Sequence, residues 1–228
     1  MVGVSVSHRP TPLASGLAVL CCGVSTAILA PTVDQRLAIV AALVGVGLVV
    51  ARGREFDAPV PDGAVWTAVG AALVVAALVR AETLVDPRHR IAVVPGIVGT
   101  ALVGLGVRPV SDRFARRFVS AGLAACLVGV ALAGVFRAAG PPRLLGAAVA
   151  AVVAWDLAEH GISLGEQLRT DAETRAVELV HGAATAAYGA VLVAVALVLY
   201  EHGATGLSLG TLLLLLAAAV TLLALLYR

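Results

Sequence analysis

Long apolar runs alternate along the chain with short polar segments that hold most of the proline, aspartate and arginine. Each run is close to the roughly 20 residues that an α-helix needs to cross the hydrocarbon core of a bilayer. The pattern predicts an all-α, polytopic transmembrane helical bundle of about eight spans: Pro12–Ala30, Val33–Ala51, Ala64–Val79, Ile91–Val107, Phe118–Phe136, Leu144–Gly161, Leu179–Tyr200 and Leu207–Tyr227. The connecting segments are too short for a soluble domain, so we expect residues 1–228 to form a single integral membrane domain.

The composition also favours a membrane protein. Hydrophobic residues make up 60% of the chain and charged residues 13%, whereas soluble domains carry about 25% charged residues. We therefore expect a multi-pass protein of the cell membrane, with the lipid bilayer and the proteins of a membrane complex as its partners. The net charge of +2 is too small to indicate a nucleic-acid partner.

The arginine distribution predicts the orientation of the chain. All 16 basic residues are arginines. If the N-terminus is cytoplasmic, the cytoplasmic segments hold ten of the 16 and the outer segments hold six. Because basic residues concentrate in cytoplasmic segments of membrane proteins, both termini are predicted to be cytoplasmic.

Small side chains inside the spans predict close helix packing. Glycine and alanine allow helix backbones to approach one another in a membrane, and suitable positions are Gly45 and Gly47, Gly99 and Gly104, Gly129 and Gly134, and Gly182 with Ala186. The three cysteines, Cys21, Cys22 and Cys126, are interpreted as small apolar packing residues rather than a disulfide framework or a metal site.

The segment from Trp155 to Tyr188 interrupts the apolar pattern with ordered polar residues. It contains six of the 14 acidic residues and two of the five histidines. One helical stripe has i, i+3, i+4 and i+7 spacing and comprises Asp156, Glu159, His160 and Ser163. A second stripe on the next predicted span comprises Glu178, His181, Thr185 and Tyr188. The segment therefore predicts a polar cytoplasmic hairpin at about residues 156–178.

The spacing also predicts which residues of the hairpin meet. Asp156 lies about 20 Å along its span at 1.5 Å per residue, where a carboxylate is costly and should face protein or water. An antiparallel hairpin that turns near residue 170 places His160 beside His181. It brings Asp156 to Thr185 or to the hydroxyl of Tyr188.

Local signals predict how the hairpin turns. Gly161 is expected to end the sixth helix. Ser163–Glu166 and Thr170–Glu173 both match the capping-box pattern. They predict a short helix around Leu164–Leu168 and a seventh helix that starts near Asp171.

Two functions can be built on these residues besides a structural one. Glu178-Leu-Val-His181 has the Glu-x-x-His spacing of metal-binding bundles, so His160, Glu178 and His181 are candidate ligands of a divalent metal in a membrane enzyme. No other cofactor is expected. Alternatively, Asp156, Glu159 and His160 have the chemistry of a proton or ion path in a small transporter. Gly161–Gly165 matches the Gly-x-Ser-x-Gly elbow of hydrolases around Ser163, but an all-helical protein lacks the strand–turn–helix that this motif requires.

The leading interpretation is a non-enzymatic scaffold or accessory subunit of a membrane complex. In it the hairpin between the sixth and seventh spans is a cytoplasmic contact site, and no residue is assigned a catalytic role. The candidates for the functional cluster are Asp156, Glu159, His160, Glu178, His181 and Tyr188.

The same segment resembles a known family pattern. Four motifs follow one another in it: Trp155-Asp156, Gly165–Leu168, Ala172–Arg175 and Glu178–His181. They are similar to the hallmark of an uncharacterised family of polytopic integral membrane proteins from halophilic archaea. The resemblance implies a membrane location and a helical fold, and it implies no activity, substrate or cofactor.

Overall fold

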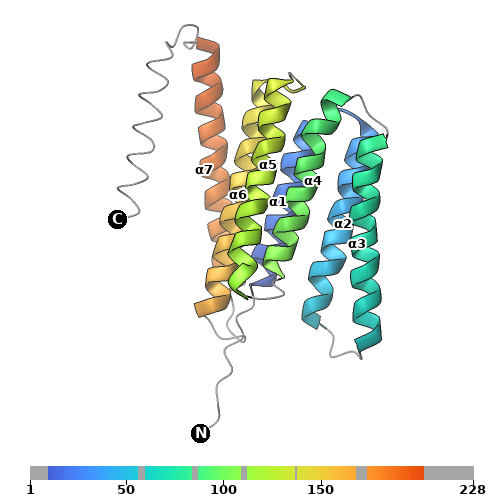
Figure 1. Cartoon of the computed structure of the whole chain (residues 1–228). Coiled ribbons are helices and arrows are strands. Elements are labelled where there is room, and N and C mark those ends of the chain that lie inside the picture. The colour runs from blue at the N-terminus through green and yellow to red at the C-terminus, as the bar shows by residue number, and fades with distance from the viewer. Residues whose placement is uncertain are drawn as a thin grey trace. The chain divides into compact units, whose positions relative to one another are not determined.

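A computed structural model describes residues 10–55, 60–83, 87–108, 112–136, 138–167 and 174–202. These residues form seven α-helices and no strand (Figure 1). The helices are α1 (Pro12–Leu29), α2 (Val33–Glu55), α3 (Val60–Thr83), α4 (Pro87–Val107), α5 (Asp112–Val135), α6 (Pro141–Gln167) and α7 (Arg175–His202). All seven are long and apolar enough to cross a membrane. The eighth predicted span, Leu207–Tyr227, lies outside the described residues.

The seven helices fall on the first seven predicted spans, and several extend past the apolar runs. α2 continues to Glu55, beyond the predicted end at Ala51, and α4 begins at Pro87, before the predicted start at Ile91. Hydropathy marks the part of a helix that lies in hydrocarbon, whereas backbone hydrogen bonding continues into the polar flanks. Proline is well suited to the first position of α4, because the first turn leaves its backbone N–H groups unpaired.

The prediction that Gly161 ends the sixth helix was wrong. α6 runs without a break through Gly161 to Gln167. A methyl group at Gly161 would lie 3.0 Å from Cβ of Ala14 and 3.3 Å from the hydroxyl oxygen of Thr11. The glycine therefore lets the first turn of α1 approach α6 closely.

The predicted turn chemistry changes accordingly. Ser163 lies inside α6, so the expected capping box at Ser163–Glu166 and the separate short helix do not form. The capping box at Thr170–Glu173 and the expected start near Asp171 lie outside the described residues. The described helix α7 begins at Arg175.

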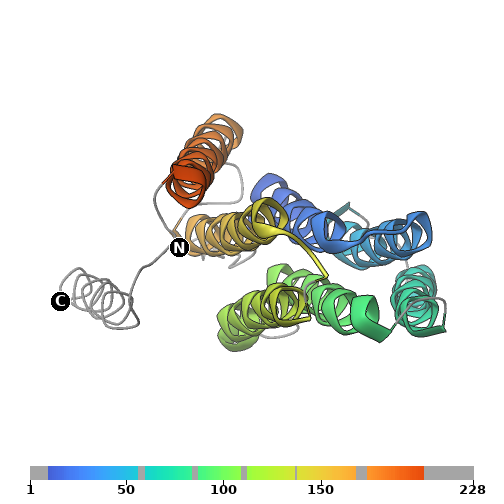
Figure 2. The ribbon, with the colours of Figure 1, turned by 90° about the horizontal axis from the view of Figure 1, so that it is seen from above.

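The first six helices form two layers. Figure 2 shows α6, α1 and α2 in one row and α5, α4 and α3 in the other. Within the layers the most extensive contacts are those of α1 with α6 and of α4 with α5. The contact of α2 with α3 joins the two layers at one end. Contacts of α1 with α4 and of α5 with α6 hold the layers together elsewhere.

Glycines mark the closest helix crossings, as small-residue packing predicts. A methyl group at Gly45 of α2 would lie 2.6 Å from the carbonyl oxygen of Gly70 on α3. A methyl group at Gly122 of α5 would lie 2.8 Å from the carbonyl oxygen of Gly99 on α4. Gly47 has nothing within 4 Å of such a methyl group, so it takes no part in these crossings.

The chain divides into two compact units, Met1–Val193 and Ala194–Arg228. The first unit contains α1 to α6 and most of α7. The polar contacts of the α6–α7 hairpin described below all lie within it. The described part of the second unit, up to His202, is the last part of α7.

Candidate functional site

A cluster of four polar side chains joins α6 to α7. We call Asp156, His160, His181 and Thr185 the seam cluster. Nε2 of His181 lies 2.8 Å from Oδ2 of Asp156, and the hydroxyl of Thr185 donates a hydrogen bond of 2.8 Å to the same oxygen. The rings of His160 and His181 are stacked, with centroids 3.9 Å apart and planes 12° from parallel.

Helical spacing produces this arrangement. Asp156 and His160 are four residues apart on α6, and His181 and Thr185 are four residues apart on α7, so each pair occupies one face. The antiparallel hairpin brings the two faces together, which matches the geometry that the sequence predicts. Of the two predicted partners of Asp156, Thr185 makes the contact. Tyr188, three residues after Thr185 on α7, is 67% exposed.

The cluster is partly open to its surroundings. The side chains of His181 and Asp156 are 35% and 33% exposed. In a bilayer, the exposed third of the Asp156 side chain would lie at the edge of the α6–α7 contact. Two hydrogen-bond partners on one oxygen lower the cost of placing the carboxyl group there.

Glu178 has a different position from the one that the metal interpretation needs. It is buried, and its carboxylate accepts a hydrogen bond of 2.7 Å from the backbone N–H of Ala14 in α1. The hydroxyl of Thr174, one turn earlier, donates to the other carboxylate oxygen. The contact spans 164 residues and fixes the start of α1 against α7.

Glu178 acts as a cap for the N-terminus of α1. The N-cap residue Thr11 makes no capping hydrogen bond with its side chain. A capping box would require Glu or Gln at the third helical position, and Ala14 stands there. The sequence gives no sign of a remote cap, because Thr11 is itself a favourable N-cap residue. The backbone N–H of Thr11 also donates a hydrogen bond of 3.1 Å to the carbonyl oxygen of Gly161, so α6 and α7 together hold the first turn of α1.

The predicted polar stripe of α6 divides between two neighbours. Glu159 lies 3.7 Å from Nε of Arg116 on α5, and Glu166 lies 2.7 Å from Nη2 of the same arginine. Nη2 of Arg116 also donates a hydrogen bond of 3.5 Å to the hydroxyl of Ser163. Asp156 and His160 face α7 instead. Glu159 is thus separated from the seam cluster, and the hydroxyl of Ser163 has an arginine partner rather than a histidine base.

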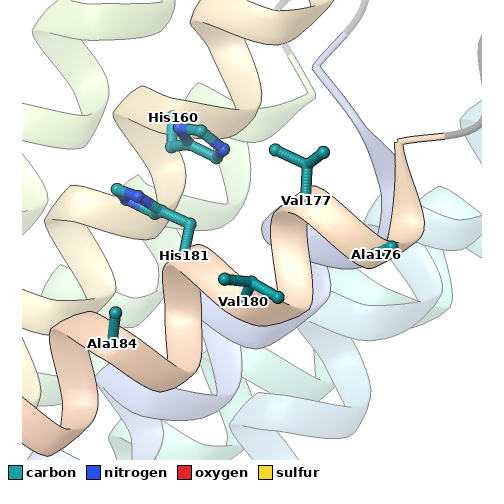
Figure 3. A pocket seen from close by; sticks show the side chains of 6 residues that line it. All are labelled: His160, Ala176, Val177, Val180, His181 and Ala184. Carbon is teal, nitrogen blue, oxygen red and sulfur yellow. The ribbon is translucent and has the colours of Figure 1, made fainter.

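A shallow surface depression of about 520 Å³ adjoins the two histidines. It is lined by His160, Ala176, Val177, Val180, His181 and Ala184, and Figure 3 shows the two imidazole rings lying over each other at its edge. Nε2 of His160 is buried and has no hydrogen-bond partner among the described residues. Apart from the two imidazoles, the walls are alanine and valine, which supply no ligand for a metal.

The residues predicted to bind a metal are not brought together as a ligand set. Within the described residues there is no group of three or more His, Cys, Asp or Glu side chains placed to hold a metal ion. His160 and His181 meet, but the carboxylate of Glu178 is directed to the backbone of α1. The arrangement is suited to holding helices together through polar contacts.

Fold and site define a polytopic α-helical protein of the membrane-spanning type, whose polar residues join α5 and α7 to α6 and α1 to α7. A family model described as a family of unknown function, DUF7519, matches residues 61–223, and the chain belongs to that family. The match covers α3 to α7 and the residues that follow, and thus the whole polar hairpin. No curated protein and no solved structure has significant similarity to the chain.

The pair Asp156–His181 should show energetic coupling. We expect the free energies of unfolding of Asp156→Ala, His181→Ala and the double variant to be non-additive by roughly 0.5–1 kcal/mol, the usual size for a polar contact between membrane helices. The measurement is unfolding in mixed detergent micelles. Glu159→Ala combined with His181→Ala is the matched control and should be additive, because Glu159 contacts α5. Equal coupling in both pairs would show that the hydrogen bond is not its source.

Proposed function

We propose that the protein is a non-enzymatic membrane scaffold or accessory subunit that binds a transmembrane helix of a partner protein through α7 and the adjoining hairpin. In this proposal the protein has eight spans, both termini lie on the cytoplasmic side of the cell membrane, and the protein comes from halophilic archaea, as expected from the sequence. The observation that carries it is the one-sided docking of α7 on the rest of the bundle.

The docked side of α7 is narrow. Among its residues, Glu178, Gly182 and Gly189 are buried, and their spacing of four and seven places them on one face. A methyl group at Gly182 would lie 3.0 Å from Leu157, and one at Gly189 would contact Val149. With the seam cluster, these contacts attach α7 to α6 along a single stripe.

The remaining surface of α7 is apolar and exposed. Val180 is 70% exposed and Val191 is 59% exposed. Tyr188 stands in this surface one turn beyond Thr185, at about the predicted depth of Asp156. A tyrosine hydroxyl at that depth needs a hydrogen-bond partner that lipid tails do not supply. A neighbouring protein helix with a polar group would supply one.

The polar residues of the hairpin support a structural role. Asp156, Glu178 and Glu159 are directed to α7, α1 and α5 respectively, and each has a protein partner. The arrangement gives less support to a proton path, because the carboxylate of Glu159 is directed to Arg116 on α5 rather than to the seam cluster. It gives less support to a metal-dependent enzyme, because the carboxylate of Glu178 caps α1.

Site-specific photo-crosslinking in native membranes tests the proposal. A photoreactive amino acid at Tyr188 should give a discrete protein adduct, and Arg175→Glu, a charge reversal at the exposed start of α7, should weaken it. The matched control is Val75 on α3, which is 59% exposed and should react with lipid alone. Lipid adducts alone at Tyr188, or the same protein adduct at Val75, would refute α7 as the contact helix.

A further inference from the structure

Two buried cysteines from different layers of the bundle lie in contact. Sγ of Cys22 on α1 is 2.9 Å from Sγ of Cys126 on α5. Both are free thiols, and the two residues are 1% and 2% exposed. A disulfide bond is about 2.05 Å long, so bond formation requires the sulfurs to approach by less than about 1 Å.

Glycines of α4 make this contact possible. α4 packs against both α1 and α5. A methyl group at Gly99 would lie 2.5 Å from Sγ of Cys126, and one at Gly96 would collide with Thr26 of α1. Larger residues at these positions would displace the helices that carry the two thiols. The sequence interpretation of the cysteines as packing residues did not anticipate that positions 104 residues apart would meet.

We propose that Cys22 and Cys126 form a reversible disulfide that links the two layers of the bundle. The two S–H bonds break and one S–S bond forms, with two electrons and two protons passing to a small lipid-soluble oxidant. Molecular oxygen fits this class because it enters apolar interiors, and the same transfer reduces it to hydrogen peroxide. A dithiol reductant reverses the step by thiol–disulfide exchange.

The bond would have a defined structural effect. α1 belongs to the layer with α6 and α2, and α5 belongs to the layer with α4 and α3 (Figure 2). The thiol form holds the layers together by packing and by polar contacts such as that of Arg116 with Glu166, whereas the disulfide form adds a covalent link. Cys21, the neighbour of Cys22, is partly exposed and stays a free thiol in both forms, so it provides an internal reference.

Counting thiols tests the proposal on the full-length protein. The protein is purified in detergent, treated with air and copper(II)–phenanthroline or with dithiothreitol, denatured, alkylated with N-ethylmaleimide and weighed by mass spectrometry. The reduced protein should carry three alkyl groups and the oxidised protein one. Oxidised Cys21→Ser should carry none, whereas Cys22→Ser and Cys126→Ser should each keep two.

Peptide mapping of the unreduced wild-type protein makes the test independent of the variants. It should recover the peptide of Cys22 linked to that of Cys126. Three alkyl groups on the oxidised protein would overturn the proposal. A loss of two thiols that persists in Cys126→Ser would overturn it as well, because it would place the bond between Cys21 and Cys22.

Discussion

Glu178→Ala is expected to lower the free energy of unfolding by about 1–4 kcal/mol. The substitution leaves the backbone N–H of Ala14 buried without an acceptor, which costs about 1–3 kcal/mol. It also removes a negative charge from the N-terminus of α1, where the helix dipole favours one, for a further cost of up to about 1 kcal/mol. Unfolding in mixed detergent micelles, followed by circular dichroism, measures the loss.

Two further variants separate capping from charge. Glu178→Gln keeps a carbonyl oxygen that can accept from Ala14, so it should recover at least half of the lost stability. Glu166→Ala removes an acid that is 46% exposed beside Arg116, and it should change stability by less than about 0.5 kcal/mol. Equal losses in Glu178→Ala and Glu166→Ala would show that Glu178 is not a significant cap.

The positions of the seven described helices could be predicted because a bilayer leaves few alternatives. A segment in hydrocarbon must pair its own backbone groups, so an apolar run of sufficient length becomes a helix. The seam cluster could be predicted for a related reason. Residues four apart share a helix face, and a short connection forces the two helices to be antiparallel, which brings His160 to His181.

The role of Glu178 could not be predicted from its own neighbourhood. Its partner Ala14 is 164 residues away and contributes a backbone N–H group, which leaves no trace in the side-chain pattern. The Glu-x-x-His spacing correctly predicts that Glu178 and His181 are neighbours on the surface of α7. However, residues three apart differ in direction by about 60° around a helix. The side chains of Glu178 and His181 can therefore reach different neighbouring helices.

Gly161 and Glu159 show two further limits. Glycine is favourable at a helix end and also where two helices touch, and only the position of α1 decides between these roles. Glu159 and His160 are adjacent, so their directions differ by about 100° around α6. A stripe of that width faces two neighbours, and the sequence alone does not reveal that α5 carries Arg116 on that side.

Gly45→Ala is expected to lower the free energy of unfolding by about 1–3 kcal/mol, the usual cost of overpacking. The added methyl group would lie 2.6 Å from the carbonyl oxygen of Gly70 and 3.0 Å from Cβ of Leu73. Neither atom belongs to the flexible end of a side chain, so α2 and α3 must move apart. The contact is reciprocal, because a methyl group at Gly70 would lie 2.5 Å from the carbonyl oxygen of Gly45. Gly70→Ala should therefore have a similar effect.

Gly47→Ala is the matched control for the crossing of α2 and α3. It lies on the same helix two residues away, gains the same methyl group and has nothing within 4 Å of it. Any gain in helix propensity from replacing glycine is shared by both variants and cancels in the comparison. The difference between them therefore measures the helix contact alone. We expect Gly47→Ala to stay within about 0.5 kcal/mol of the wild type, as surface substitutions usually do. If the two variants have the same stability, the close approach of Gly45 to Gly70 does not hold α2 against α3.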